Sequence, residues 1–339
     1  MGSYILVRRL FSISLLLFVM AGLSIPAFAD DNKITIMIGG IEKQIYLPAK
    51  LAEQLGYFKE QGITVELQSQ PAGVEAENEL LAGSVQGVVG FYDHTIDLQT
   101  KNKAVLSVVQ FSQAPGEVVL VSSKQAAQIK SPRDFKGKNL GVTGLGSSTN
   151  FLMQYLSVTN GVSVKEITAI PVGAGSTFIA AMTKGVIDVG MTTEPTISRM
   201  LKTGDAKVLV DLRTPQTTIN ALGGLYPAAS LYMPTAWVNS HKPTVQKLAN
   251  ALVKTLKYIH THSAEEIASH MPADYYAGDK AAYVSALAAS KAMFTPDGKM
   301  PPSGPPTVLK VLSAFDKNVQ GKSVDLSRTF TTEFVSAAE

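Results

Sequence analysis

The sequence contains no cysteine among its 339 residues, which excludes disulfide bonds, thiolate metal sites and thiol nucleophiles. It also carries little net charge. Its 30 lysines and arginines against 27 aspartates and glutamates give +3, so nothing indicates nucleic-acid binding. The 45% hydrophobic content excludes a disordered chain, and a chain of this length is expected to form two compact units.

Motifs for catalysis and nucleotide binding are also missing. There is no G-x-S-x-G elbow and no G-x-x-x-x-G-K-[ST] loop, and neither Gly144-x-Gly146 nor Gly173-x-Gly175 continues into G-x-G-x-x-G. The two histidines at 260 and 262 would lie on different sides of a helix, without an H-E-x-x-H pattern. We therefore expect no enzyme activity, no cofactor and no metal site.

The first thirty residues have the features of a secretory signal peptide. Arg8 and Arg9 precede an apolar run over residues 10–21, and Ala27-Phe28-Ala29 is an A-x-A cleavage site. A membrane anchor, the alternative, would need about 20 uninterrupted apolar residues, and no later segment of the chain supplies them either. Cleavage of residues 1–29 predicts a soluble protein free in the periplasm, because no cysteine follows the cleavage site to accept a lipid.

Beyond residue 30, short apolar runs alternate with helical patterns in two successive passes. The first pass predicts strands at 34–38, 63–67 and 86–89, with helices at 47–61 and 75–82 between them. The second predicts strands at 140–143, 167–172 and 187–190, with helices at 149–158 and 176–183. Strands separated by such helices indicate right-handed crossovers and a mainly parallel sheet.

The two passes resemble each other in the order of helix, glycine, strand and polar turn, at residues 83–93 and again at 185–195. Chance similarity in an Ala- and Gly-rich chain is the alternative. The β-rich segments 117–122 and 228–238 are placed to cross between two similar α/β lobes. The first lobe is then discontinuous, residues 30–120 and 225–339, and the second is 121–224. The C-terminal part predicts a helix over 243–260, a proline-rich loop at 301–306 and a last helix from about Thr307.

Ligand sites in open parallel sheets lie at the carboxyl ends of the strands. This rule selects residues 39–44, 90–94, 144–150 and 192–195, which we expect to face one cleft. In the third stretch two glycines allow close backbone approach to a ligand, and the helix that follows favours an anionic or strongly polar group. An ordinary helix cap formed by Ser147, Ser148 and Thr149 is the alternative.

The second stretch, an aromatic and polar turn, directly follows an apolar strand. Alternation along the strand places Phe91 in the core and Tyr92 in the cleft, where Tyr92 and Asp93 would orient a ligand. In the fourth stretch Glu194 either accepts a hydrogen bond from the ligand or caps the next helix.

The chain resembles a known family in three places. Residues 49–65 read AKLAEQLGYFKEQGITV, residues 131–142 read SPRDFKGKNLGV, and GVID at 185–188 precedes Glu194-Pro195. After a signal peptide, this set is similar to the nitrate, sulfonate, taurine and thiamine-precursor group of periplasmic solute-binding proteins, the NMT1/THI5-like group. The resemblance implies an α/β, two-lobe type II periplasmic binding protein fold. Each lobe would be a mainly parallel sheet flanked by helices, joined to the other by two crossover strands.

What the resemblance implies for function is a monomer that closes on a small-molecule ligand and delivers it to an inner-membrane ABC-type permease. Where relatives often have Asp-Pro, this chain has Glu194-Pro195. The four stretches hold no arginine and only Lys43, so a monoanion or a neutral amphiphile, such as a sulfonate or carboxylate, is expected rather than a multiply charged oxyanion. Carried over by position, the ligand contacts are Gly40, Ile41, Gln44, Tyr92, Asp93, Ser147, Ser148, Thr149, Thr193 and Glu194.

Two other functions remain open. A thiamine-pyrimidine synthase of the same fold family would use a histidine and a cysteine-rich segment, and the absence of cysteine and the export signal both oppose it. A sensor that binds the ligand without transport is not distinguished by the sequence.

Overall fold

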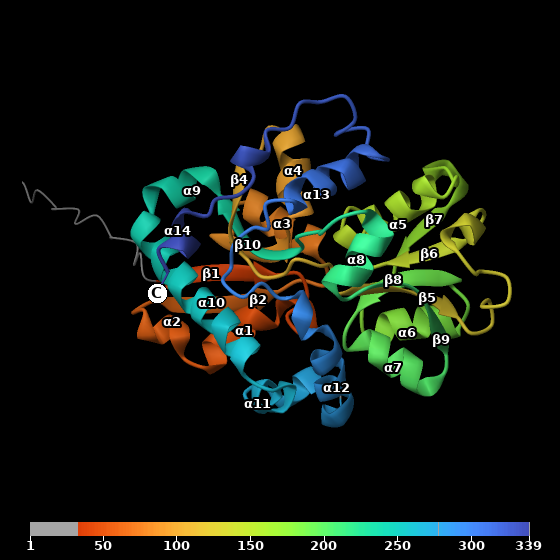
Figure 1. Cartoon of the computed structure of the whole chain (residues 1–339), viewed down its shortest axis with the longest axis horizontal. Coiled ribbons are helices and arrows are strands. Elements are labelled where there is room, and N and C mark those ends of the chain that lie inside the picture. The colour runs from red at the N-terminus through yellow and green to blue at the C-terminus, as the bar shows by residue number, and fades with distance from the viewer. Residues whose placement is uncertain (1–32, 277, 339) are drawn as a thin grey trace, which may run out of the picture. The chain divides into compact units, whose positions relative to one another are not determined.

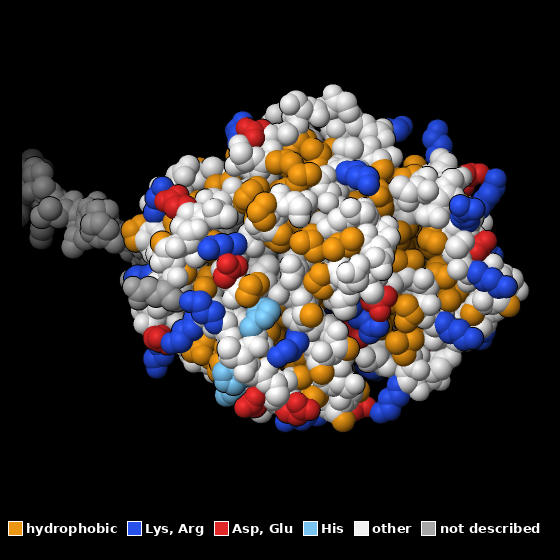
Figure 2. Space-filling view, viewed as in Figure 1, with side chains coloured by type: hydrophobic (Ala, Val, Ile, Leu, Met, Phe, Trp, Pro, Cys, Tyr) orange, Lys and Arg blue, Asp and Glu red, His pale blue; other side chains and the backbone are white. Residues whose placement is uncertain are grey.

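The computed structural model describes residues 33–276 and 278–338, so the signal peptide predicted for residues 1–29 lies outside the described part. The described chain forms two five-stranded mixed sheets flanked by helices (Figure 1). None of the helices in these two ranges combines the length and the apolar character needed to cross a bilayer. Lysine, arginine and acidic side chains alternate around the outline of the face in Figure 2, with small groups of exposed hydrophobic side chains between them.

The first sheet has the order β2-β1-β3-β10-β4. β1 pairs in parallel with β2 and β3, whereas β10 pairs antiparallel with β3 and β4. We call this sheet with its helices the first lobe. Its strands are β1 (Lys33–Ile38), β2 (Thr64–Ser69), β3 (Gly87–Phe91), β4 (Val105–Gln110) and β10 (Ala229–Pro234).

The second sheet repeats this arrangement in the order β7-β6-β8-β5-β9, and with its helices it forms the second lobe. β6 is parallel to β7 and β8, and β5 is the antiparallel strand between β8 and β9. The matching orders confirm the predicted repeat and the α/β fold class. The strands are β5 (Glu117–Ser122), β6 (Asn139–Val142), β7 (Thr168–Pro171), β8 (Val189–Thr193) and β9 (Ala206–Leu212).

The predicted crossover strands belong to the sheets themselves. The chain leaves the first sheet after β4 and enters the second as β5, and it returns to the first sheet as β10. The connection before β5 is tightly packed: a Cβ on Gly116, which has φ +67°, would lie 2.5 Å from Ile45 Cγ2 and 2.6 Å from Met293 Sδ. β3, β5 and β8 are buried along their whole length. This explains why they read as apolar runs rather than alternating patterns.

The helices of the first pass and the central part of the chain cover the faces of the sheets (Figure 1). The predicted helix 47–61 is in fact two helices, because Gly56 adopts a left-handed conformation with φ +74° between them. These helices are α1 (Leu47–Gln54), α2 (Tyr57–Glu60), α3 (Gly73–Leu81), α4 (Asp93–Thr100), α5 (Ser148–Thr159), α6 (Ser176–Thr183), α7 (Thr196–Thr203) and α8 (Pro215–Leu222).

The C-terminal part is largely helical and packs mainly against the first lobe. The helix predicted from about Thr307 begins earlier, at Gly304, because Pro305 and Pro306 occupy its first turn, where proline needs no amide donor. It is not the last helix, because the short helix α14 follows later in the chain. Residues 235–238, predicted as the end of a crossover strand, are helical. The helices are α9 (Thr235–Ser240), α10 (Lys242–Thr261), α11 (Ala264–Ser269), α12 (Lys280–Ser290), α13 (Gly304–Ser313) and α14 (Glu333–Ser336).

Candidate functional site

The two lobes touch where the selected strand ends meet. The Gln44 N–H donates to the Glu194 carbonyl oxygen at 3.2 Å, which joins the first and fourth stretches. The ring of His94 in the first lobe meets the ring of Phe151 in the second edge-on, with centroids 6.1 Å apart. The loop after β1, the turn after β3 and the start of α5 therefore belong to one region between the lobes.

The loop after β1 is shaped by a buried lysine. The Lys43 ammonium donates to the carbonyl oxygens of Gly39 at 2.5 Å and Pro71 at 2.9 Å. Gly40 has φ +109°, and a Cβ there would lie 2.4 Å from Lys43 Cε, so only glycine fits. Burial lowers the pKa of Lys43, although the nearby carboxyl groups oppose this shift. The Ile41 N–H donates to Ser69 Oγ at 3.1 Å, and its side chain packs against the core.

Gln44 is buried and its amide has a fixed orientation. Its Nε2 donates to the Tyr283 carbonyl oxygen at 2.9 Å. Its Oε1 then has no hydrogen-bond partner among the described residues. A buried acceptor is left open at this point.

Asp93 starts α4 directly after β3 and is fully buried. Its Oδ2 accepts a hydrogen bond from the Tyr226 hydroxyl at 2.8 Å, while Oδ1 has no partner in the described part of the chain. Burial raises the pKa of Asp93 to about 7, against the lowering effects of Tyr226 and the His94 backbone. Sequence analysis did not identify Tyr226, whose only signal is an aromatic residue shortly before β10.

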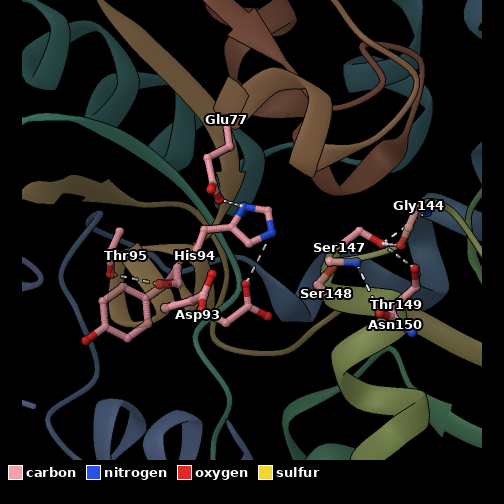
Figure 3. Close-up of polar contacts among 12 residues, drawn as sticks. Glu77, Asp93, His94, Thr95, Gly144, Ser147, Ser148, Thr149 and Asn150 are labelled. Carbon is pink, nitrogen blue, oxygen red and sulfur yellow. Dashed lines mark hydrogen bonds and ion pairs between the residues drawn. The ribbon is translucent and has the colours of Figure 1, made fainter. Parts of the chain in front are cut away.

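His94 lies between Glu77 and Asp93 (Figure 3). Its Nδ1 is 3.2 Å from the Tyr232 hydroxyl and 3.5 Å from Glu77 Oε2, and its Nε2 is 3.8 Å from Asp93 Oδ1. Burial lowers the pKa of His94 to about 4 and raises that of Glu77 to about 8. At neutral pH both groups are therefore uncharged, and their contact is not an ion pair.

Tyr92 does not take the position expected for it. Its hydroxyl lies 2.5 Å from Thr329 Oγ1, and its ring meets that of Phe330 edge-on at 6.3 Å. The side chain is fully buried against the C-terminal segment. Phe91 is buried against Tyr46, as expected for a core residue. The reason for the difference is that position 92 has already left the strand and begun the turn into α4, so strand alternation does not apply.

The turn before α5 uses most of its hydroxyl groups internally (Figure 3). Ser147 Oγ donates to the Gly144 carbonyl oxygen at 2.7 Å and lies 2.9 Å from Thr149 Oγ1, which accepts from the Thr143 N–H. Ser148 Oγ instead donates to Glu117 Oε1 at 3.2 Å. The start of this helix therefore already faces a carboxyl group of the protein itself.

Glu117 is a second site residue that sequence reasoning missed. It begins β5, is buried, and its Oε2 has no partner among the residues of the structure described above. Burial raises the pKa of Glu117 well above its usual range; Asp93 adds to this rise, and Ser148 and Lys43 oppose it. Its neighbour in the β5–β8 register is Thr193, whose Oγ1 is also buried without a partner. The available signal was one acidic residue at the start of an otherwise apolar strand.

Glu194 acts as a structural cap. Its Oε2 accepts from the Ser198 N–H at 2.9 Å in α7, and Arg213 Nη1 donates to its Oε1 at 3.3 Å. Arg213 also binds Asp211, with Nη2 2.6 Å from Oδ2. Of the two roles considered for the Glu194 side chain, the contacts match the cap, while its carbonyl group joins the lobes.

A cavity of about 410 Å³ adjoins this region at the boundary between the lobes. Glu77 and Val74 line it from the first lobe, and Gly146 and Phe151 from the second. Across residues 33–276 and 278–338, no cluster of three or more histidine or acidic side chains is arranged to hold a metal ion.

Comparison with known proteins places the chain in a family. A family model described as NMT1/THI5 like matches residues 46–266. A solved structure of a protein from Bordetella bronchiseptica RB50 is 35% identical, with a TM-score of 0.87 over 90% of this chain and 96% of that one. The alkanesulfonate-binding protein SsuA from Xanthomonas axonopodis pv. citri, bound to MOPS, is 18% identical, with a TM-score of 0.65 over 89% of this chain and 98% of that one. The second likeness concerns the fold, which is that of periplasmic binding proteins.

A further relative is an enzyme. The 4-amino-5-hydroxymethyl-2-methylpyrimidine phosphate synthase of Aspergillus parasiticus is 28% identical over 167 residues, 49% of this chain and 47% of that protein. This chain thus spans about half the length of that relative. The family model covers about two thirds of the chain, and the chain therefore belongs to the NMT1/THI5-like family.

Proposed function

We propose that this protein is an extracytoplasmic solute-binding protein that captures a small organic molecule between its lobes and delivers it to an ABC-type permease in the inner membrane. One observation carries the proposal. Buried polar atoms without partners in the described structure belong to residues of both lobes near their boundary: Gln44 Oε1, Asp93 Oδ1, Glu117 Oε2 and Thr193 Oγ1. Leaving one such atom unpaired costs about 1–3 kcal/mol, so a set of them at one place calls for a ligand.

The proposed mechanism is hinge closure. A molecule held by both lobes has all its contacts only when the lobes touch, so it stabilises that arrangement, and the permease recognises it. The two moving bodies would be the predicted lobes, residues 30–120 with 225–339 and residues 121–224. Because β5 begins at Glu117, the first boundary would lie a few residues before position 120. The protein would act as a monomer in the periplasm after cleavage of residues 1–29. The resemblance to the family favours sulfonates, carboxylates and related amphiphiles.

The proposed ligand contacts keep most of the set taken from the family. Gly40, Ile41, Gln44, Asp93, Ser148 and Thr193 remain, and Glu117 is added. Tyr92, Ser147, Thr149 and Glu194 support the site from behind, since their side-chain groups are used within the protein.

A second candidate is an enzyme related to pyrimidine phosphate synthases, favoured by the partial sequence match and by the buried histidine next to Asp93. One experiment separates the two candidate functions. Protein lacking residues 1–29 is mixed with an ultrafiltered small-molecule extract of bacterial cells, washed and denatured, and the released compounds are identified by mass spectrometry. Scattering with and without the retained compound should show compaction. Retention of nothing would contradict binding, and release of a chemically altered compound would favour the enzyme.

A further inference from the structure

Most of the buried atoms at the lobe boundary without partners among the described residues accept hydrogen bonds, while Thr193 Oγ1 can also donate and His94 Nε2 is a ring nitrogen. The chemistry of the acceptors deepens the proposed function and rests on it. Gln44 Oε1, Asp93 Oδ1 and Glu117 Oε2 are all oxygen atoms that accept hydrogen bonds. Glu75 Oε2, on α3 at the same boundary, is a further buried oxygen without a partner in the ranges described. Glu75 Oε1 is 3.5 Å from where a Cβ on Gly144 would lie, which places this carboxyl against the second lobe.

Hydrogen bonds and strand pairing connect the residues that carry these atoms. Gln44 bonds to the backbone of Glu194, the residue after Thr193, and Thr193 is the register partner of Glu117. Glu117 in turn accepts from Ser148 at the start of α5. Asp93 joins from the first lobe through the hydrogen bond that its Oδ2 accepts from the Tyr226 hydroxyl. Burial raises the pKa of that hydroxyl, and Asp93 and Glu117 both add to the rise.

The orientation of the Gln44 amide matters here, since a flipped amide would present a donor. Its nitrogen must face the Tyr283 carbonyl, because an amide oxygen at 2.9 Å from another carbonyl oxygen would leave both without a hydrogen. The oxygen therefore faces the open side.

Two cations of the region are already engaged. Lys43 donates to two backbone carbonyls, and Arg213 binds Asp211 and Glu194. The start of α5, which the sequence suggested for an anion, has Glu117 against the hydroxyl of Ser148. An oxyanion entering there would meet carboxyl groups rather than free positive charge.

We propose that the ligand carries a protonated amine or amidine group, whose N–H bonds donate to Gln44 Oε1, Asp93 Oδ1 and Glu117 Oε2. The charged nitrogen balances the buried carboxylates, and its several donors fit several acceptors. The rest of the ligand extends from this group and is not restricted by the argument, so a zwitterion with an ammonium end satisfies it.

Proton release follows from the same geometry. Without a ligand, burial raises the pKa of Glu117 well above its usual range and that of Asp93 to about 7. A cation that arrives between them favours the ionised carboxylates and expels protons. An oxyanion would instead need both groups protonated and would take up protons. The titratable groups that act on the pair include Lys43, Tyr46, Glu77, Asp97, Tyr226 and Tyr232, together with the His94 backbone and the His94 ring, whose Nε2 is 3.8 Å from Asp93 Oδ1.

The test uses the compound retained from the ultrafiltered extract. Calorimetric titration of wild-type protein at pH 7 in phosphate and in Tris buffer, which differ in ionisation enthalpy, gives the number of protons released or taken up. We expect a compound with a protonated amine or amidine and a net release. Glu117→Gln keeps the shape and an acceptor oxygen but loses the charge, and it should weaken binding at least about tenfold. Glu265→Gln, at an exposed position in α11, is the matched control and should leave binding unchanged.

The outcomes distinguish the inference about the ligand from the solute-binding proposal. A retained anion without a positively charged nitrogen, or net proton uptake, overturns the inference about the ligand and leaves the solute-binding proposal standing. Retention of no compound overturns both. The calorimetry needs no variant, so a Glu117→Gln protein that fails to fold does not remove the test.

Discussion

Gly144 offers a way to perturb the contact between the lobes without disturbing either lobe. A Cβ at this position would lie 3.1 Å from Val74 Cγ1 and 3.2 Å from Ala72 Cβ, and both neighbours belong to the first lobe. These distances are shorter than ordinary carbon contacts, so Gly144→Ala crowds the boundary and Gly144→Val crowds it more. In the separated arrangement the added methyl groups meet only solvent.

The expected magnitude follows from the cost of overpacking, about 1–3 kcal/mol. Only the arrangement with touching lobes bears this cost, so it appears in the apparent affinity. Since 1.4 kcal/mol is tenfold, binding of the retained compound should weaken by roughly 5-fold to 150-fold, with the alanine variant near the lower figure. The assay is calorimetric titration together with thermal unfolding of the ligand-free protein, whose midpoint should stay close to that of the wild type.

Gly141→Ala is the matched control from the same lobe. Its Cβ would lie 2.3 Å from Ile187 Cδ1, within the second lobe, so the crowding is present in both arrangements. We expect this variant to unfold at a lower temperature without ligand. The reasoning is refuted if Gly144→Val binds as tightly as the wild type, or if its ligand-free protein is destabilised as much as that of Gly141→Ala.

Two further predictions concern buried titratable groups. Burial raises the pKa of Glu77 from 4.5 to about 8, so the folded chain holds a proton that the unfolded chain releases, and stability falls as the pH rises between these values. His94, with its pKa lowered from 6.5 to about 4, acts in the opposite direction, but only below pH 6.5. Asp93 and Glu117, whose pKa values are also raised by burial, act in the same direction as Glu77. Urea unfolding should therefore show a loss of unfolding free energy from pH 6.5 to 8, to which Glu77 contributes at most about 1.4 kcal/mol per pH unit, and Glu77→Gln should reduce the slope; an unchanged slope would contradict this assignment. Tyr226→Phe removes the hydrogen bond to Asp93 and should cost about 1–3 kcal/mol of unfolding free energy. Tyr283→Phe removes a hydroxyl without a partner in the described chain and should cost nearly nothing, so equal losses in denaturant would argue against the Asp93 contact.

Much of the fold could be predicted from local patterns, because glycines mark the ends of many short helices and strands in the sequence. The predicted helix 176–183 agrees with the structure at both ends. The strands β4 and β9, which were not predicted, lie at sheet edges. Which of their side chains are apolar depends on packing against segments far away in the sequence, so their local pattern is weak. The segment 117–122 is the strand by which the chain enters the second lobe, as predicted, but only the pairing with β8 and β9 shows that it lies inside the second sheet.

The candidate site was harder to predict than the fold. The rule for strand ends identified Gln44 and Asp93, because their positions depend on topology that the sequence reveals. It missed Glu117, which stands at the amino end of an antiparallel strand and so reaches the same edge of the sheet from the other direction. It also counted only the lysines and arginines in the loops and left out the carboxyl groups contributed by β5 and α3.

The position of β10 between β3 and β4 affects the order in which the protein can be completed during synthesis. Every strand of the second sheet lies within residues 117–212, so that half can pair fully as soon as it has been made. The sheet that begins at the amino terminus must wait with a gap in its middle until residues 229–234 arrive. A fragment that stops before them therefore leaves β3 and β4 without their shared neighbour, and the half that is translated first is the half that matures last.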